Sequence, residues 1–309
     1  MRAIVCTAYG PPEVLQFRDI EDPRPKRGEV LIRVRATSVH RGDSRMRGLD
    51  IPGPVTHRVL ARLVLGLWRP RKAILGMELA GEIVGVGAGV TRFREGDRVF
   101  ASTAWSGFGA YAELKCMAED GVIATMPAEV SFEEAAVIPS GGITALGILE
   151  RARLQPGQRL LVYGAAGSVG TFAVQLGRAL GAEVTGVCSA RSLELVRSLG
   201  AARVIDRAQE GLAAQCQPYD FVFDAVGKLE GADRRALTGT GVFLDVHTAS
   251  DALRAADAPR LLRELKTLIE AGKLKAVIDR HHRWEQIVEA HRYVDQGHKQ
   301  GNVAVTVGG

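Results

Sequence analysis

A glycine-rich turn between an apolar run and an amphipathic run constrains this chain more than any other feature. The residues from Leu160 to Asp206 read LLVYGAAGSVGTFAVQLGRALGAEVTGVCSARSLELVRSLGAARVID. The first apolar run ends in the turn, which opens a helical pattern that closes at Gly181. A second apolar run, a short helix and a third strand follow. This order predicts a βαβαβ unit with room for a phosphate at its first turn.

Helical and strand patterns alternate from about Ala124 onward, which predicts a parallel sheet covered on both faces. The predicted strands are 159–163, 183–188, 204–206, 219–225 and 241–246. The predicted helices are 168–180, 192–199 and one that ends at Gly272. Residues 276–279 and 302–307 read as strands that return to the first domain, with a helix over 284–297 between them.

Residues 1 to about 124 read as strands and turns. The segment GEVLIRVRATSV alternates apolar and basic side chains, with Val30, Ile32 and Val34 on one face and Arg33 and Arg35 on the other. A length of 309 residues allows two domains. We therefore expect an α/β protein that combines a compact β-rich domain with a doubly wound parallel sheet.

Composition limits the cellular setting and the partners. The net charge of +5 is modest and does not by itself indicate nucleic acid. No run of about 18 apolar residues is present, which predicts no transmembrane helix. The N-terminal residues enter a strand pattern without a signal peptide, and the four scattered cysteines suit reduced thiols. These features predict a cytoplasmic protein with neither nucleic acid nor membrane as partner.

Much of the positive charge lies between Arg58 and Lys72. One face of the helix expected there is apolar, and it comprises Val59, Leu60, Leu63, Val64, Leu67 and Trp68. We interpret the segment as a helix that packs on its domain and is solvated on its basic side. A lid over the substrate and a contact with a membrane surface are the alternatives.

The glycines of the turn would allow a phosphate to approach the backbone. A pyrophosphate can approach backbone N–H groups only where no Cβ intervenes, and a helix N-terminus adds favourable partial charge. Gly164, Gly167 and Gly170 provide such a turn, although Ala165 stands where the strict G-x-G-x-x-G pattern has its first glycine. The flanking strands and helix stand at the expected places. A dinucleotide site is therefore favoured over a purely structural turn.

The end of the second strand indicates which dinucleotide binds. An NAD site places Asp or Glu there, whereas this chain has Ser189 and Arg191 and no acid before Glu194. A hydroxyl and a guanidinium suit a 2′-phosphate, so we expect NADPH. The alternative is that these residues only begin a solvated helix, with Ser189 or Ser192 as its N-cap.

Several motifs together resemble the medium-chain dehydrogenase/reductase superfamily, in its zinc-free, quinone-oxidoreductase-like branch. The resemblance covers nearly the whole chain. The matching segments are SVHRGDSRMRG, LGMELAGEIVGVGAGVTRFREGDRVF, GAYAEL, IPSGGITALGIL, VYGAAGSVG, YDFVFDAVG and the C-terminal GKLKAVIDRHHRWEQIVEAHRYVDQGHKQGNVAVTV.

The resemblance implies a GroES-like catalytic domain over 1–124 and 273–309, with a Rossmann nucleotide-binding domain over 125–272 inserted between its parts. It also implies the residues that bind NADPH. They are Gly164, Gly167, Ser168, Val169 and Gly170 at the turn, Ser189 and Arg191 at the 2′-phosphate, Ala225, Val226 and Gly227 after the fourth strand, and Thr144 near the nicotinamide.

Zinc-dependent members of the superfamily carry a Cys three residues before an Asp, a GHE motif and a four-cysteine lobe. This chain has His40 before Asp43, Met77 and Glu78 in place of the last two GHE residues, and no such lobe. A catalytic zinc normally takes three protein ligands. We therefore predict no metal.

The resemblance implies hydride transfer from NADPH to a quinone or an α,β-unsaturated carbonyl. His40, Asp43 and Thr144 are the candidate catalytic residues, and His40 could donate or relay a proton. Structural roles are the alternative, with His40 satisfied inside a tight loop and Asp43 as a helix cap.

Two other functions stay open, namely a zinc-free alcohol or ketone oxidoreductase and a non-catalytic NADPH-binding protein. The segment after Val246 is shorter than in relatives, where a further strand often joins two subunits. This shortening weakens the expectation of a homodimer. It also makes the non-catalytic alternative more plausible than it would be for a relative with the full-length segment.

Overall fold

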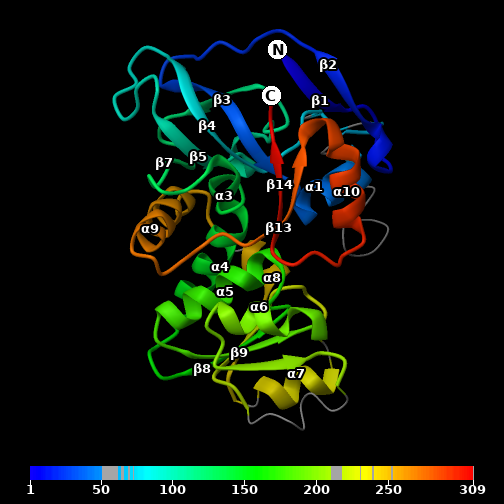
Figure 1. Cartoon of the computed structure of the whole chain (residues 1–309), viewed down its shortest axis with the longest axis vertical. Helices are drawn as coiled ribbons and strands as arrows, with labels where there is room; N and C mark the ends of the chain where they lie inside the picture. Colours follow the sequence, from blue (N-terminus) through cyan, green and yellow to red (C-terminus); the bar gives the residue numbers. More distant parts are fainter. Residues whose placement is uncertain are drawn as a thin grey trace. The chain divides into compact units, whose positions relative to one another are not determined.

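The computed structural model describes residues 1–50, 62–63, 66–68, 70–71, 73–209, 218–229, 231–238, 240–251 and 253–308. The chain forms two units, one of Met1–Ser140 with Ile278–Gly309 and the other of Gly141–Val277. We call them the β-rich unit and the parallel-sheet unit. Domain boundaries near residues 124 and 272 stay predictions from sequence. Both ends of the chain belong to the β-rich unit (Figure 1).

The β-rich unit contains a mainly antiparallel sheet of order β13-β14-β3-β4-β5-β7, with β6 also paired to β3, and a separate pair β1-β2. Its strands are β1 Arg2–Cys6, β2 Leu15–Asp19, β3 Glu29–Ser38, β4 Glu78–Val86, β5 Arg98–Ser102, β6 Leu114–Ala118, β7 Ile123–Thr125, β13 Ile278–Arg283 and β14 Asn302–Thr306. Its helices are α1 Arg41–Gly48, α3 Phe132–Ala136 and α10 Ile287–Asp295, with short 3-10 turns at η1 Pro12–Val14, η2 Ala104–Ser106 and η5 Trp284–Gln286.

Strand β3 lies at the centre of this sheet and confirms the alternation expected from sequence. Val30, Ile32 and Val34 are at most 2% exposed, whereas Arg33 and Arg35 face outward. Alternate side chains of a strand point to opposite faces, so one face of β3 enters the core.

The C-terminal strands complete the sheet that the N-terminal strands begin. Strand β14 runs antiparallel to β3 with Ala304 opposite Ser38, and β13 pairs with β14 in parallel. Figure 1 shows the red β14 beside the orange β13, its partner on the side away from β3. The predicted strand at 276–279 begins instead at Ile278 and runs to Arg283, because its pairing with β14 starts opposite Asn302.

The parallel-sheet unit has the strand order β10-β9-β8-β11-β12, and every pair is parallel. Its strands are β8 Arg159–Tyr163, β9 Glu183–Cys188, β10 Arg203–Asp206, β11 Phe221–Asp224 and β12 Val242–Asp245. Helix α4 Pro139–Ala152 precedes these strands. The helices that connect or follow them are α5 Ser168–Ala179, α6 Leu193–Ser198 after the turn η3 Ala190–Ser192, α7 Gly231–Thr238, α8 Val246–Asp251 and α9 Ala258–Glu270. This is the predicted doubly wound sheet, with a topological switch point between β8 and β11.

Helix α8 begins at Val246, directly after β12. In the described residues, β12 is an edge strand of this sheet, and no further strand follows it there. Most of the basic segment between Arg58 and Lys72 lies outside the described residues, as does Cys216. Of its described apolar residues, Leu63, Leu67 and Trp68 are 56%, 55% and 84% exposed. In the described part of the chain, no helix has both the length and the apolar character to cross a membrane.

Candidate functional site

The glycine turn follows β8 and is tied to the neighbouring strand. The N–H groups of Gly164 and Ala165 both donate to the carbonyl of Val187 on β9, at 2.9 and 3.0 Å. Gly164 has a φ of +78°, a conformation that favours glycine. Gly167 is the N-cap of α5 and has ordinary extended dihedrals, with φ −81° and ψ 177°. The turn therefore directs the start of α5 toward the carboxyl edge of the sheet.

Gly170 and Gly167 differ in what surrounds them. A Cβ at Gly170 would lie 2.2 Å from the carbonyl oxygen of Gly164, so glycine is required there for helix and turn to pack. A Cβ at Gly167 would meet only that same oxygen, at 3.4 Å. The first N–H groups of a helix lack partners within the helix, and a glycine N-cap supplies no side chain to cap them. The residues present therefore fit the phosphates of a dinucleotide.

The loop after β11 lies against the glycine turn. A Cβ at Gly164 would come within 2.7 Å of Val226 Cγ1, and Ala225 N–H donates to Tyr163 O at 2.9 Å. Gly227 has a φ of +68°. The structure thus brings two of the predicted nucleotide-binding groups together at the switch point between β8 and β11.

Asp224, which ends β11, organises this loop although the sequence analysis did not single it out. Its Oδ1 accepts the N–H groups of Val226 and Gly227 at 3.0 and 2.9 Å. Its Oδ2 accepts those of Lys228 and Leu229 at 2.7 and 2.6 Å. An acidic residue followed by Ala-Val-Gly at a strand end was the signal available in the sequence.

Ser189 and Arg191 follow β9, as the sequence places them. The hydroxyls of Ser189 and Ser192 lie 3.3 Å apart, and neither side chain caps the helix that follows. Ser189 and Ser192 thus stand at the N-cap positions of η3 and α6 without a side-chain capping bond, and the 2′-phosphate role of Ser189 stays a prediction. Arg191 is exposed. Arg207 also reaches this edge, since its N–H donates to Cys188 O at 2.7 Å.

The three remaining nucleotide candidates lie on helices, Ser168 and the half-buried Val169 on α5 and Thr144 on α4. Ser168, in the first turn of α5, is 7% exposed, and its hydroxyl is 2.8 Å from the position of a Cβ at Gly141. The Ser168 hydroxyl therefore packs against α4. Thr144 is half-buried on α4, and it belongs to a different unit from His40 and Asp43.

In the β-rich unit, His40 and Asp43 form a capping box at the start of α1. Asp43 Oδ2 accepts His40 N–H at 2.9 Å, and His40 Nδ1 accepts Gly42 N–H at 3.2 Å. Asp43 Oδ1 also accepts Gly76 N–H at 3.1 Å, and the residue is 1% exposed. Burial raises the pKa of Asp43 to about 7, with these N–H groups opposing the rise. Asp43 thus has the capping role that the sequence left open.

The environment of His40 favours hydrogen-bond donation over proton relay. Burial, with the positive charges of Lys299 and Arg45, lowers the pKa of His40 to about 3. The imidazole is therefore neutral near pH 7. Because Nδ1 accepts the Gly42 N–H, the ring hydrogen belongs on Nε2. His40 can donate this hydrogen to an acceptor.

Glu78 and Met77 are already engaged by their neighbours. The Glu78 carboxylate accepts the Ser38 hydroxyl, and its Oε2 accepts Ser140 N–H at 2.7 Å. Met77 Sδ lies 2.4 Å from the position of a Cβ at Gly42, so its side chain packs on the start of α1. Within the described residues, no group of three or more His, Cys, Asp or Glu side chains could hold a metal. These side chains do not fit a catalytic zinc.

A buried chain of hydrogen bonds ties α1 to α10. Arg47 donates from Nη1 to His291 Nδ1 at 3.0 Å, and its Nη2 pairs with Asp295 at 2.7 Å. Arginine can only donate, so His291 keeps its hydrogen on Nε2, which lies 3.1 Å from the Tyr111 hydroxyl. That hydroxyl lies 3.2 Å from Ser38 O. The chain fixes the segment that leads into His40.

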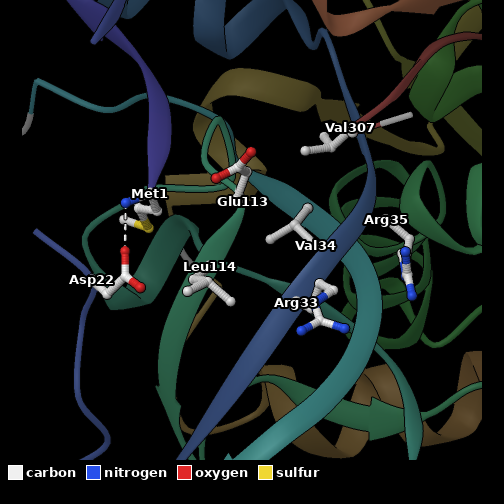
Figure 2. Close-up of a pocket in the computed structure, with 9 residues that line it drawn as sticks. Met1, Asp22, Arg33, Val34, Arg35, Glu113, Leu114 and Val307 are labelled. Carbon is white, nitrogen blue, oxygen red and sulfur yellow. Dashed lines mark hydrogen bonds and ion pairs between the residues drawn. The ribbon is translucent and has the colours of Figure 1, made fainter. Parts of the chain in front are cut away.

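One hollow in the β-rich unit lies apart from all the predicted residues. It has a volume of about 330 Å³ and opens beside β3, between the end of β14 and the start of β6. Figure 2 shows Arg33 and Arg35 at its wall, with the ion pair between the Met1 amine and Asp22. Its charged lining contains none of the candidate site residues.

Family comparisons agree with this geometry. The family model for alcohol dehydrogenase GroES-like domains matches residues 26–144, and that for zinc-binding dehydrogenases matches residues 199–305. The Arabidopsis thaliana chloroplastic NADPH-dependent alkenal/one oxidoreductase is 30% identical, over 99% of this chain and 79% of its own length. A quinone oxidoreductase of Pseudomonas aeruginosa is 36% identical over 74% of this chain and 67% of its own length.

Solved structures extend the likeness to the whole fold. The quinone oxidoreductase of Coxiella burnetii superposes with a TM-score of 0.84 at 28% identity, covering 100% of this chain and 99% of the other. An alcohol dehydrogenase superfamily protein of Novosphingobium aromaticivorans gives a TM-score of 0.81 at 29% identity, with 100% of both chains covered. The two-unit architecture is therefore shared with both structures over their full lengths.

Proposed function

Because the chain belongs to the medium-chain dehydrogenase/reductase superfamily, in its quinone-oxidoreductase-like branch, we propose that it reduces quinones or α,β-unsaturated carbonyls with NADPH and without zinc. Its relatives include NADPH-dependent and NAD(P)H oxidoreductases, and their similarity supports the same general activity for this chain. The acceptor, the preference for NADPH and the independence from zinc are the parts that we add. A small-molecule acceptor is the partner this function needs. The cytoplasmic location and the weakened homodimer stay predictions.

The glycine turn at the N-terminus of α5 carries the proposal. Gly167 has no side chain to cap the helix, and only Gly164 O lies within 4 Å of where its Cβ would be, while Gly170 lets the turn pack closely on the helix. These residues, with Ser168 and Val169, would hold the pyrophosphate. The loop at Val226, which packs on the glycine turn, would also contact the coenzyme. When bound, the reduced nicotinamide supplies the hydride, and Thr144 is the residue that we assign to its neighbourhood.

The preference for NADPH rests on the end of β9. The Ser189 hydroxyl makes no capping hydrogen bond although Ser189 is the N-cap of η3, and Arg191 is exposed and able to pair with a 2′-phosphate. No carboxylate follows β9 before Glu194 to accept from a ribose 2′-hydroxyl. NADH would lose the paired bonds to Arg191 and bind more weakly.

Independence from zinc rests on the loop at His40. Met77 offers a thioether, and the Glu78 carboxylate is taken by Ser38 and Ser140. The neutral His40 ring supplies an Nε2–H donor for the oxygen of a carbonyl acceptor, where charge develops during reduction. The alkenal/one and quinone oxidoreductases among the relatives support acceptors of this type.

The test is coenzyme oxidation against a panel of acceptors. We expect NADPH absorbance to fall steadily with a small quinone or enone, more slowly with NADH, and at the same rate after chelator treatment. Turnover of simple ketones alone would replace this function with that of a ketone reductase. Tight NADPH binding without turnover of any acceptor would leave a non-catalytic binding protein. Loss of activity with a chelator, restored by zinc, would overturn the metal-free proposal.

A further inference from the structure

Lys299 is a cation that neither the motifs nor the proposed function uses. It lies between α10 and β14, and it is half-buried. Its ammonium donates to Gly301 O. A lysine ammonium has three hydrogens to donate, so this contact leaves it able to bind further acceptors.

Pairing within the sheet brings the Lys299 segment to the His40 loop. Val39 N–H donates to Val303 O at 3.0 Å, and Ala304 is opposite Ser38. The end of β3, which leads into His40, therefore lies directly beside β14. This placement agrees with the electrostatics, because the Lys299 charge is one of the two that lower the pKa of His40.

Two carboxylates keep the ammonium charged in this setting. Burial lowers the pKa of Lys299 to about 8, while the charges of Glu78 and Asp279 oppose that fall. The Glu78 carboxylate already accepts from Ser38 and Ser140, and Asp279 Oδ2 accepts Gln300 N–H at 2.8 Å. Both carboxylates therefore accept hydrogen bonds from other groups, and the Lys299 ammonium can also contact a ligand.

Two other polar side chains of this region already have partners. The Tyr111 hydroxyl contacts Ser38 O and His291 and is fully buried, and Arg47 bonds Gly10, His291 and Asp295. We propose that the Lys299 ammonium, together with His40 Nε2–H, binds the carbonyl oxygen of the acceptor and stabilises the negative charge that develops on it. This inference rests on the proposed function and names the group that replaces a metal in it.

The chemistry balances with NADPH as the reductant. An enone acceptor gains the hydride at its β-carbon, its C=C electron pair moves to form the enolate, and its C=O pair moves onto oxygen. That oxyanion is the group that Lys299 stabilises. Protonation of the α-carbon by water then completes the saturated ketone. A quinone likewise passes through a phenolate oxygen on its way to the quinol.

The experiment compares Lys299→Met and Lys299→Arg, with Lys26→Met as the matched control. Lys26 is an exposed lysine of the same unit, away from the His40 loop. We expect Lys299→Met to lower kcat for an enone by about 10²–10³-fold, as loss of an oxyanion donor does. Lys299→Arg should keep most of the rate, and Lys26→Met should match wild type.

A second measurement tests directly whether Lys299 binds a negatively charged oxygen. The probe is 4-nitrophenol, whose phenolate absorbs distinctly and mimics the oxyanion, titrated into the protein saturated with NADP⁺. Wild type and Lys299→Arg should bind the phenolate, and Lys299→Met should bind it at least about tenfold more weakly. If Lys299→Met is unstable, Glu78→Gln with Lys299→Met removes the carboxylate left behind. This double variant should fold and still fail to bind phenolate.

The outcomes separate this inference from the function on which it rests. Enone reduction and phenolate binding at wild-type levels in Lys299→Met would overturn the role of Lys299 and leave the proposed function intact. A slower Lys299→Met that binds phenolate normally would also overturn it. Wild type that reduces no quinone or enone would refute the proposed function, even if phenolate binding still depended on Lys299.

Discussion

A Cβ atom at Gly170 would lie 2.2 Å from the carbonyl oxygen of Gly164. The two glycines therefore pack helix α5 onto the turn that precedes it. Gly167, between them, faces only that oxygen at an ordinary contact distance of 3.4 Å. One glycine is thus needed for the fold, and another leaves space beside the helix N-terminus. Substitutions can separate these two roles.

Gly170→Ala should destabilise the protein. The added methyl must displace the backbone of Gly164 and Ala165, and overpacking of this kind costs about 1–3 kcal/mol. The free energy of unfolding in urea measures the effect. Gly48→Ala is the control, because a Cβ there would meet only Asp50 Cβ at 4.0 Å. Equal stability of the two variants would contradict the packing argument.

Gly167→Ala should fold and bind NADPH poorly. Its φ of −81° suits alanine, and we expect a stability loss of no more than about 1 kcal/mol. The methyl would occupy the space through which a pyrophosphate reaches the helix N–H groups, so affinity should fall at least about tenfold. Isothermal calorimetry provides the measurement. Wild-type affinity in this variant would mean that the phosphates bind elsewhere.

Arg191→Ala should discriminate between the coenzymes. Hydrogen bonds to a charged group contribute about 1.5–3 kcal/mol, so NADPH affinity should fall about 10- to 100-fold. Affinity for NADH should not change. Arg197→Ala, which removes an exposed arginine from α6, should leave both affinities intact. An equal loss of affinity for both coenzymes would show that Arg191 does not recognise the 2′-phosphate.

Asp224→Asn should loosen the loop against the glycine turn. One carboxylate oxygen becomes an amide nitrogen that cannot accept the two N–H groups it now faces. Each buried donor left unsatisfied costs about 1–3 kcal/mol. Urea unfolding should show the loss, and NADPH should bind more weakly. Asp257→Asn is the control, since Asp257 is exposed and its side chain makes no capping bond.

His291 should make stability depend on pH. Burial and the Arg47 charge lower its pKa in the folded protein to about 3, from an ordinary value of 6.5. Between these values the unfolded chain binds the extra proton, so acidification favours unfolding by about 1.4 kcal/mol per pH unit. The advantage of wild type over His291→Gln should therefore shrink as pH falls from 6.5 toward 4.

The control for this prediction keeps the histidine. Tyr111→Phe removes the hydroxyl beside His291 Nε2 and retains the ring. The difference between wild type and Tyr111→Phe should stay nearly constant over the same pH range. Urea unfolding at several pH values measures both differences, and a constant gap for His291→Gln would show that its burial carries no such penalty.

Local patterns predicted the parallel-sheet unit well. The strands Arg159–Tyr163 and Glu183–Cys188 have the predicted bounds, and α5 begins at the predicted Ser168. These elements are specified by neighbours in sequence, because apolar periodicity and glycine conformations act over a few residues. The short strand near Ile278 was placed less well, since its length depends on pairing with β14.

The sequence by itself determined the βαβ framework, the glycines of its turn and the family to which they point. Tertiary structure alone decided that Asp224 holds a loop against that turn, that Asp43 is locked by backbone N–H groups, and that Lys299 lies near His40. His40 and Lys299 are far apart in the chain, and the pairing of β14 with β3 brings their neighbouring segments together. Charge and protonation follow from burial and from such long-range neighbours, which no local pattern encodes.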